Sequence, residues 1–248
     1  MGYRAFLQRQ TGFSLVELLI YVTLSTAVMG SIYQTVRAQQ KSYSSQNHLT
    51  EVQQNLRVAT YILSKDIRST AYNPTGRAAV GFVTKFAAPN DKFVIDYTTQ
   101  NTMVALLTDT DGNGTVDANS TEQIAYRFNS TKKTLERFVS TATLPGGDWE
   151  TVIDNVDAAN FVFLGANGTV TTSPQNIRTV QIALLVRARK ADPKFINTET
   201  YKNKQGQVLC TACANDHYQR RLLTTTVQAR NCAYDGLQNL CVVPGLQS

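Results

Sequence analysis

Histidine is scarce in this chain of 248 residues, which has only two, His48 and His217. They lie far apart in the sequence, and neither is part of a nucleophile or metal-ligand motif, so the usual residues of acid–base catalysis are not grouped. A stripe of basic residues interleaved with aromatic residues, as in nucleic-acid grooves, is also missing. We therefore predict neither an enzyme nor a nucleic-acid-binding protein.

Acidic residues are missing from the first twelve residues, which contain Arg4 and Arg9. The whole chain has a net charge of +6, and without this segment 22 basic and 18 acidic residues remain, a net charge of +4. The basic residues are spread along the chain. The charge balance therefore gives little support for a polyanionic partner.

Cysteine is absent from the first 209 residues, and four cysteines follow, Cys210, Cys213, Cys232 and Cys241. An even number in one region predicts two local disulfides, formed in an oxidising compartment. We expect the first pair to be linked to the second pair, which would pin a polar loop, residues 188–219, to the last strand. Free buried thiols and a zinc site stay open as alternatives, although the second pair lacks the spacing of a zinc knuckle.

Charge is almost absent from residues 13–33, FSLVELLIYVTLSTAVMGSIY, in which Glu17 is the one charged residue. A helix of this length rises about 30 Å, enough to span the hydrocarbon core of a bilayer. In a secretory signal the cleavage site follows the apolar run, whereas here the small residue Gly12 precedes it. Cleavage after Gly12 would remove residues 1–12 as a leader and leave the apolar helix in the protein.

Glu17 is costly inside an apolar span, because a carboxylate there costs about 2.5 kcal/mol or more unless it has a partner. Cleavage after Gly12 would create an α-ammonium group on Phe13, four residues away. That group is the nearest positive charge, either in the same chain or in a neighbouring chain packed beside it.

The segment TG-FSLVELLI resembles the signature of type IV prepilins. This resemblance implies that a prepilin peptidase cuts between Gly12 and Phe13 and methylates the new amine. It implies that Glu17 neutralises the ammonium group of an adjacent subunit during assembly. It also implies a single-pass protein of the inner membrane, with a periplasmic globular domain that later lies on the pilus at the cell surface. The implied partners are the peptidase, other major and minor pilins, and the inner-membrane assembly platform.

In residues 34–72 the apolar residues thin out to a stripe with helical spacing. Its members are Leu49, Val52, Leu56, Ala59, Leu63 and Ile67. Because no glycine or proline interrupts residues 32–71, we expect one continuous helix from Phe13 to about Thr70. The amphipathic second half of this helix is predicted to pack against a sheet of its own chain.

The remaining residues, 73–248, contain β-branched and aromatic runs separated by turn residues. The predicted strands are residues 79–86, 92–98, 103–107, 123–128, 134–139, 161–164, 180–187 and 222–229. A long helix followed by strands predicts an α+β fold, in which an antiparallel sheet of a globular domain is laid on the helix.

Three further segments resemble minor pilins of the PilW type. They are DIRSTAYNP at residues 66–74, IRTVQIALLVRAR at 177–189 and YQRRLLTTTVQARN at 218–231. The resemblance implies a minor pilin of a type IV pilus that primes or supports assembly. A J-type minor pseudopilin of a type II secretion system is the first alternative. A solitary membrane-anchored extracytoplasmic binding domain is the second.

The acidic loop, residues 109–117 with the sequence DTDGNGTVD, is similar to the start of a calcium-binding loop. Its candidate ligands are Asp109, Asp111, Asn113, Thr115 and Asp117. Oxygen donors at the first, third and fifth positions and a glycine at the sixth let a chain curl around a hard cation. The twelfth position, however, is Ser120 instead of glutamate, and the nearest acid is Glu122. A hairpin turn explains the same pattern without a metal, and both interpretations stay open.

Overall fold

The structure is a computed structural model, and it describes residues 12–86, 90, 93–95, 97, 102–118, 120–141, 144–232, 234–235 and 238–239. For residues 41–48, 141, 144–146, 234–235 and 238–239 it describes the backbone alone. The chain divides into two compact units, residues 1–47 and residues 48–248. The boundary between these units falls inside one long helix.

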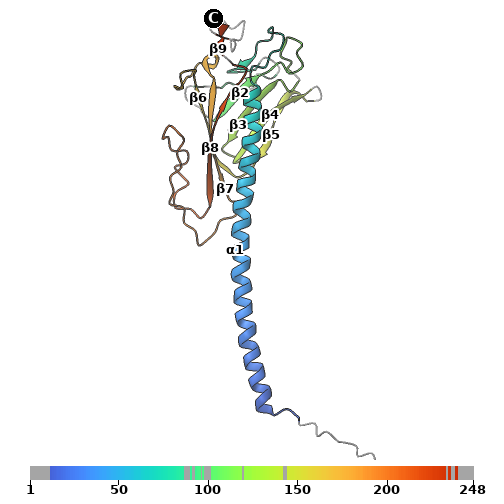
Figure 1. The fold of residues 1–248 in the computed structure, drawn as a ribbon, viewed down its shortest axis with the longest axis vertical. Coiled ribbons are helices and arrows are strands. Elements are labelled where there is room, and N and C mark those ends of the chain that lie inside the picture. The colour runs from blue at the N-terminus through green and yellow to red at the C-terminus, as the bar shows by residue number, and fades with distance from the viewer. Residues whose placement is uncertain are drawn as a thin grey trace, which may run out of the picture. The chain divides into compact units, whose positions relative to one another are not determined.

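Helix α1 runs without a break from Leu15 to Ser69, which confirms the predicted continuous helix (Figure 1). In the first unit the helix from Leu15 to Gln40 is long and apolar enough to cross a membrane, and none of it is buried. Hydroxyl groups in this segment donate to carbonyl oxygens one turn back, as Thr23 Oγ1 does to Leu19 O at 3.0 Å. Since the helix satisfies these polar groups itself, they add little to the cost of an apolar environment.

In the second unit α1 buries one stripe of apolar side chains. Val52, Leu56, Ala59, Leu63 and Ile67 are each no more than 3% exposed. Leu49, the first residue of the predicted stripe, is only half-buried. Each buried aliphatic side chain contributes about 1.5–3 kcal/mol relative to an exposed one. The stripe therefore fixes this half of the helix to the sheets of its own chain.

Two antiparallel sheets pack with the second half of α1 (Figure 1). The first has the order β1-β2-β3-β4-β5, with bounds Gly81–Phe82, Met103–Leu107, Gln123–Asn129, Thr134–Thr141 and Leu144–Ile153. The second has the order β6-β7-β8, with bounds Val156–Leu164, Thr179–Arg187 and Arg220–Gln228. A short 3-10 helix, η1 (Pro174–Asn176), precedes β7, and β9 (Tyr234–Asp235) pairs with β10 (Gln238–Asn239). The α+β fold class is confirmed.

The main core lies between α1 and the two sheets, and a smaller core lies on the other face of the three-stranded sheet. Along β7, Ile182 and Leu184 belong to the main core, whereas Leu185 belongs to the smaller one. Residues 188–219, which we call the strap, cover that smaller core with Tyr201 and Cys213. The polar loop predicted between the last two long strands is therefore a cover for the outer face of this sheet.

The strand predictions were least accurate at the edges of the first sheet. The predicted strand at residues 79–86 is reduced to the two residues of β1, and residues 93–95 of the predicted strand at 92–98 are not a strand. Strand β5 was missed because it begins with the strand-breaking sequence Leu-Pro-Gly-Gly. Gly147 has a φ of 60°, and a Cβ there would lie 2.1 Å from Cζ of Phe138. Glycine is needed here for close packing at an edge strand, where such residues are tolerated.

Candidate functional sites

Gly12 and Phe13 precede the first turn of α1 and are both exposed. A Cβ placed on Gly12 would have nothing within 4 Å, and the Phe13 side chain is 79% exposed. An exposed, non-helical peptide bond is the kind of bond that a peptidase can reach. The geometry at this bond is therefore compatible with the predicted cleavage.

Glu17 lies in the first turn of α1. The helix begins with the hydrogen bond from Leu18 N to Ser14 O at 3.1 Å, so the N–H groups ahead of residue 18 have no partner inside the helix. The positive end of the helix dipole stabilises a carboxylate here by about 0.3–1 kcal/mol. Among the described residues no cation forms an ion pair with Glu17. The dipole alone offsets only part of the cost of this carboxylate in an apolar environment.

The acidic loop brings three carboxylates together. One oxygen from each of Asp109, Asp111 and Glu122 lies within 4.8 Å of the others. Asp109 is fully buried, and its Oδ1 and Oδ2 accept hydrogen bonds from Gly112 N at 2.9 Å and Gly114 N at 3.1 Å. Both glycines have positive φ angles, 75° and 88°, which lets the loop turn its N–H groups toward Asp109.

Glu122, the residue just before β3, closes the loop, a role that the calcium motif gives to the twelfth residue. Its Oε1 accepts from Thr110 N at 2.8 Å and Asp111 N at 3.2 Å, and its Oε2 accepts from Asp117 N at 2.9 Å. The site prediction did not include Glu122 because it lies two residues beyond the expected position. The nearest following acid was the signal that could have identified it.

The other predicted ligands are held by hydrogen bonds within the loop. Asn113 Nδ2 donates to Asp111 Oδ2 at 2.9 Å and to Asp117 Oδ2 at 3.2 Å, and Thr115 Oγ1 donates to Asn113 Oδ1 at 2.7 Å. Three clustered carboxylates suit a hard cation such as calcium. Because backbone N–H groups already bind several of these oxygens, the loop can also close without a metal. Calcium binding therefore stays a prediction.

The predicted disulfide connectivity is wrong. Cys210 and Cys213 are bonded to each other, with their Cα atoms 5.5 Å apart, and not to Cys232 or Cys241. The reason is that Cys213 lies in the smaller core under the strap, whereas Cys232 lies in the main core on the opposite face of the sheet. Cys232 is itself disulfide-bonded, and Cys241 lies outside the described residues. Cys210 and Cys213 therefore do not link the strap to the segment that follows β8.

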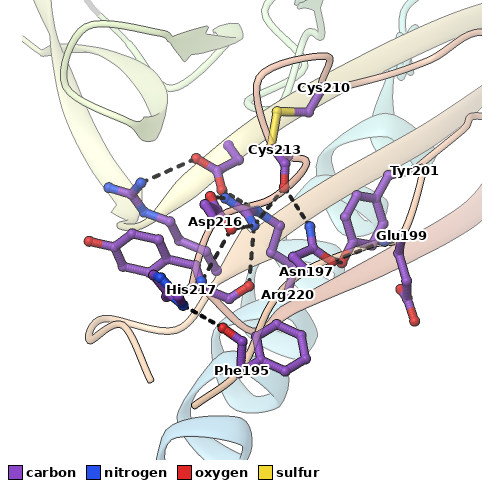
Figure 2. Close-up of polar contacts among 12 residues, drawn as sticks. Phe195, Asn197, Glu199, Tyr201, Cys210, Cys213, Asp216, His217 and Arg220 are labelled. Atoms are coloured by element: carbon purple, nitrogen blue, oxygen red, sulfur yellow. Dashed lines mark hydrogen bonds and ion pairs between the residues drawn. A yellow bond between two sulfur atoms is a disulfide. The ribbon is translucent and has the colours of Figure 1, made fainter. Parts of the chain in front are cut away.

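A buried arginine anchors the strap instead (Figure 2). The Arg220 side chain is 2% exposed, and its Nε donates to Asp157 Oδ2 at 2.7 Å. Its two Nη atoms pair with both oxygens of Asp216, and Nη1 also donates to Cys213 O at 3.3 Å. Asn197 Nδ2 donates to the same carbonyl at 2.6 Å. One buried guanidinium thus joins the beginning of β8, β6 and the end of the strap.

The hydrogen bonds from Arg220 lower the pKa of the Asp216 carboxyl below its ordinary value. Close by, the Tyr201 hydroxyl donates to Asn197 Oδ1 at 3.2 Å, and burial raises the pKa of Tyr201. His217 Nδ1 lies 2.6 Å from Phe195 O, and this histidine belongs to no metal-ligand cluster among the described residues. The side chain of His48 lies outside the described residues. The polar side chains drawn in Figure 2 therefore act to hold the strap in place.

A second polar cluster fixes the register of α1 against the first sheet. Tyr126 OH on β3 donates to Asp66 Oδ2 on α1 at 2.6 Å, and Arg137 Nε on β4 donates to the same oxygen at 3.2 Å. Burial, followed by the charge of Asp66, raises the pKa of Tyr126. The sequence reasoning missed this cluster. The signal for it was a carboxylate, Asp66, next to the apolar stripe of an amphipathic helix.

Models of two known families match this chain. A model of the prokaryotic N-terminal methylation motif matches residues 7–33. A model of the PilW family, described as type IV pilus-assembly protein W, matches residues 116–231. The chain is a type IV pilin-like protein. The two matched regions contain the start of α1 in this pilin-like chain and, farther along, Glu122, the strap and Arg220.

Among curated proteins, none is significantly similar in sequence to this pilin-like chain. Among solved structures, the type IV-like pilin TTHA1219 from Thermus thermophilus is similar at 15% sequence identity and a TM-score of 0.48. The similarity covers 74% of this chain and 100% of that chain. Pilins are structural proteins.

Proposed function

We propose that this pilin-like chain is a minor pilin of a type IV pilus, cleaved after Gly12 by prepilin peptidase and incorporated into the filament to prime or support its assembly. The observation that carries the proposal is the helix from Leu15 to Gln40, whose apolar side chains are all exposed. Burying such a side chain is worth about 1.5–3 kcal/mol. These residues therefore need an apolar environment that the chain itself does not supply.

Two environments supply it in succession. Before assembly the helix is in the inner membrane as a single span, with the second unit in the periplasm. After assembly the same side chains pack against the helices of other pilins, and the second unit lies on the outside of the pilus. The match to the N-terminal methylation motif supports cleavage and methylation at Phe13, and the PilW match supports a role in pilus assembly.

Glu17 acts in assembly as the partner of a neighbouring subunit's N-terminal ammonium group. The positive end of the helix dipole offsets part of the cost of this carboxylate, about 0.3–1 kcal/mol. A carboxylate in an apolar span costs about 2.5 kcal/mol or more, so most of the cost is left for a partner to offset. The methylated amine of Phe13 on an adjacent chain has the required charge.

The test compares Glu17→Ala with a matched control, Glu150→Ala, at an exposed acid on β5. We expect both variants to be cleaved and inserted in the membrane. Glu17→Ala should reach the sheared pilus fraction at least tenfold less efficiently, because the neighbour's ammonium group loses its partner. Glu150→Ala should behave as the unmodified chain. Equal incorporation of both variants would show that charge pairing at Glu17 is not needed.

The proteins that co-purify with the mature full chain separate this proposal from its alternatives. Other type IV pilins are expected. Co-purification with components of a type II secretion system would instead favour a J-type pseudopilin. A chain found alone in the membrane would favour a solitary binding domain.

A further inference from the structure

Strand β8 has an edge that pairs with no described residue. Its other edge pairs with β7 in an unbroken antiparallel register. The hydrogen bonds from Ala188 N to Gln219 O at 2.8 Å and from Ala229 N to Arg178 O at 2.9 Å continue this ladder at both ends. Hydrogen-bonded residues alternate in such a ladder, so the odd-numbered residues of β8 bond to β7. The even-numbered residues therefore direct their N–H and C=O groups away from β7.

The outward groups are those of Leu222, Thr224, Thr226 and Gln228. Within the part of the chain that the structure describes, none of these backbone groups has a hydrogen-bond partner. The side chains of Thr224, Thr226 and Gln228 are exposed. The strap crosses the face of this sheet and contacts β8 through side chains, as in the pair of Asp216 with Arg220 and the hydrogen bond from Lys204 Nζ to Thr226 Oγ1 at 2.6 Å. It leaves the backbone edge of β8 open.

The edge of the first sheet is protected in a way that β8 is not. This edge is β5, whose pairing with β4 contains two register shifts and whose second to fourth residues are Pro-Gly-Gly. Bulges, proline and glycine at an edge strand discourage pairing with other chains. The sequence of β8, RRLLTTTVQ, has no proline or glycine, and its register is regular over all nine residues. Strand β8 therefore lacks these protective features, and another strand can pair with its outer edge.

A groove of about 530 Å³ lies beside the first half of β8. It is bounded by α1, the strap and β8, and its apolar walls are Leu49, Phe195 and Leu222. Arg221 of β8 and Glu199 of the strap also line it, and Figure 2 shows Glu199 and Phe195 on the strap. Side chains of a strand alternate between its two faces. A strand that pairs with the outer edge of β8 would pass the groove at Leu222, and the side chain that faces the groove there would enter it.

We propose that the outer edge of β8 binds an extended segment of a different protein subunit of the assembly, which adds to the sheet as an antiparallel strand. An extended polypeptide is the occupant because its alternating donors and acceptors match the spacing of the outward groups. The strand is antiparallel, as every described strand pair of this protein is. It places an apolar side chain in the groove beside Leu49 and Leu222.

Charge indicates what else the added segment carries. Arg221 is exposed and forms no ion pair with any described residue. An acidic side chain in the added strand would therefore complement it. A second copy of β8 contains no acid, so it does not offer this complement. Pairing of two β8 strands is therefore a poor fit. The proposed partner strand comes from a different protein subunit and carries the acid, and this inference rests on the proposed incorporation into a pilin assembly.

Amide hydrogen exchange at single-residue resolution tests the inference. The mature full chain is measured alone in detergent micelles and again in the assembly purified with other pilins. In the isolated chain, we expect fast exchange at the outward amides of Leu222, Thr224, Thr226 and Gln228. In the assembly, their exchange should slow at least tenfold. The inward amides of β8 should be slow in both samples, which provides an internal control.

The outcomes separate this inference from the proposed function. If the chain co-purifies with pilins and its outward amides stay fast, the inference is overturned and the proposed function stands. If it co-purifies with no pilin, the proposed function fails and the assigned partner fails with it. Slow outward amides in the isolated chain at high concentration would contradict the assignment to a different subunit.

Two variants make the test specific. Thr224→Pro removes an outward N–H and no hydrogen bond to β7, and Thr224→Val keeps that N–H and the branched side chain. We expect Thr224→Pro to lose the protection of the outward amides in the assembly, while Thr224→Val keeps it. Arg221→Glu is independent of backbone geometry and should also lose the protection. Full protection in both Thr224→Pro and Arg221→Glu would overturn the inference.

Discussion

The two halves of α1 are both helical and differ in what covers their apolar side chains. From Leu15 to Gln40 none of the residues of the helix is buried. In the second unit the stripe from Val52 to Ile67 is almost completely buried against the two sheets. The second half thus has its partner within the chain, and the first half must have its partner outside it. One helix combines a folding function and an assembly function in consecutive segments.

The largest effect should come from a large-to-small change in the second half. Leu63 is fully buried, so Leu63→Ala should lower the free energy of unfolding of the second unit by about 2–5 kcal/mol. The matched change in the first half is Leu18→Ala, at a side chain that is 59% exposed. It should change this free energy by less than about 0.5 kcal/mol. Chemical unfolding of the full chain in micelles measures both, and similar losses would break the comparison.

Calcium should stabilise the second unit alone, and by less than Leu63→Ala destabilises it. A site of the extracellular kind has a dissociation constant of about 10⁻⁴–10⁻³ M. At ten times the dissociation constant, calcium would stabilise the unit by about 1.4 kcal/mol. The thermal midpoint of the full chain with calcium should exceed the midpoint with a chelator. The variant Asp111→Asn removes one clustered carboxylate and should reduce the difference. If the unmodified chain has the same thermal midpoint with calcium and with chelator, the acidic loop is a turn that closes without a metal.

The smallest expected effect is the loss of stability at low pH that comes from the pair of Asp216 and Arg220 at the end of the strap. Because the folded-state pKa of Asp216 is lowered, its contribution to stability is present above the ordinary aspartate pKa of about 3.9. It is lost as the pH falls through the lower, folded-state value. The Asp216 side chain is 30% exposed, so the loss should stay below about 1 kcal/mol. Unfolding measured from pH 7 to pH 3 should show a steeper loss for the unmodified chain than for Asp216→Asn, and parallel curves would contradict the role of this pair.

The sequence predicted those parts of the fold whose signals are local. Helix α1 is one long segment without a break, and β2, with the sequence MVALL, is an apolar run that contains no turn residue. The predicted ends of both therefore lie within two residues of the observed ends. Strand β5 was missed because its pairing depends on contact of Gly147 with Phe138, which no local pattern reveals.

The candidate sites divide in the same way. The residues at the beginning of α1, Gly12, Phe13 and Glu17, belong to one contiguous motif, which a family model also matches, and their roles stay predictions. The partner of Cys213 depends on which face of the three-stranded sheet each cysteine occupies, and Glu122 depends on how the acidic loop closes onto β3. These are tertiary facts that spacing alone does not encode.

Cleavage after Gly12 and incorporation into the pilus are tested together by the mass of the chain recovered from sheared pili. We expect a mature protein that begins with N-methyl-Phe13, because the bond after Gly12 is exposed and the apolar helix beyond it must be kept. A chain with an intact Met1, or one that has lost the apolar segment through a cut after residue 33, would contradict the account.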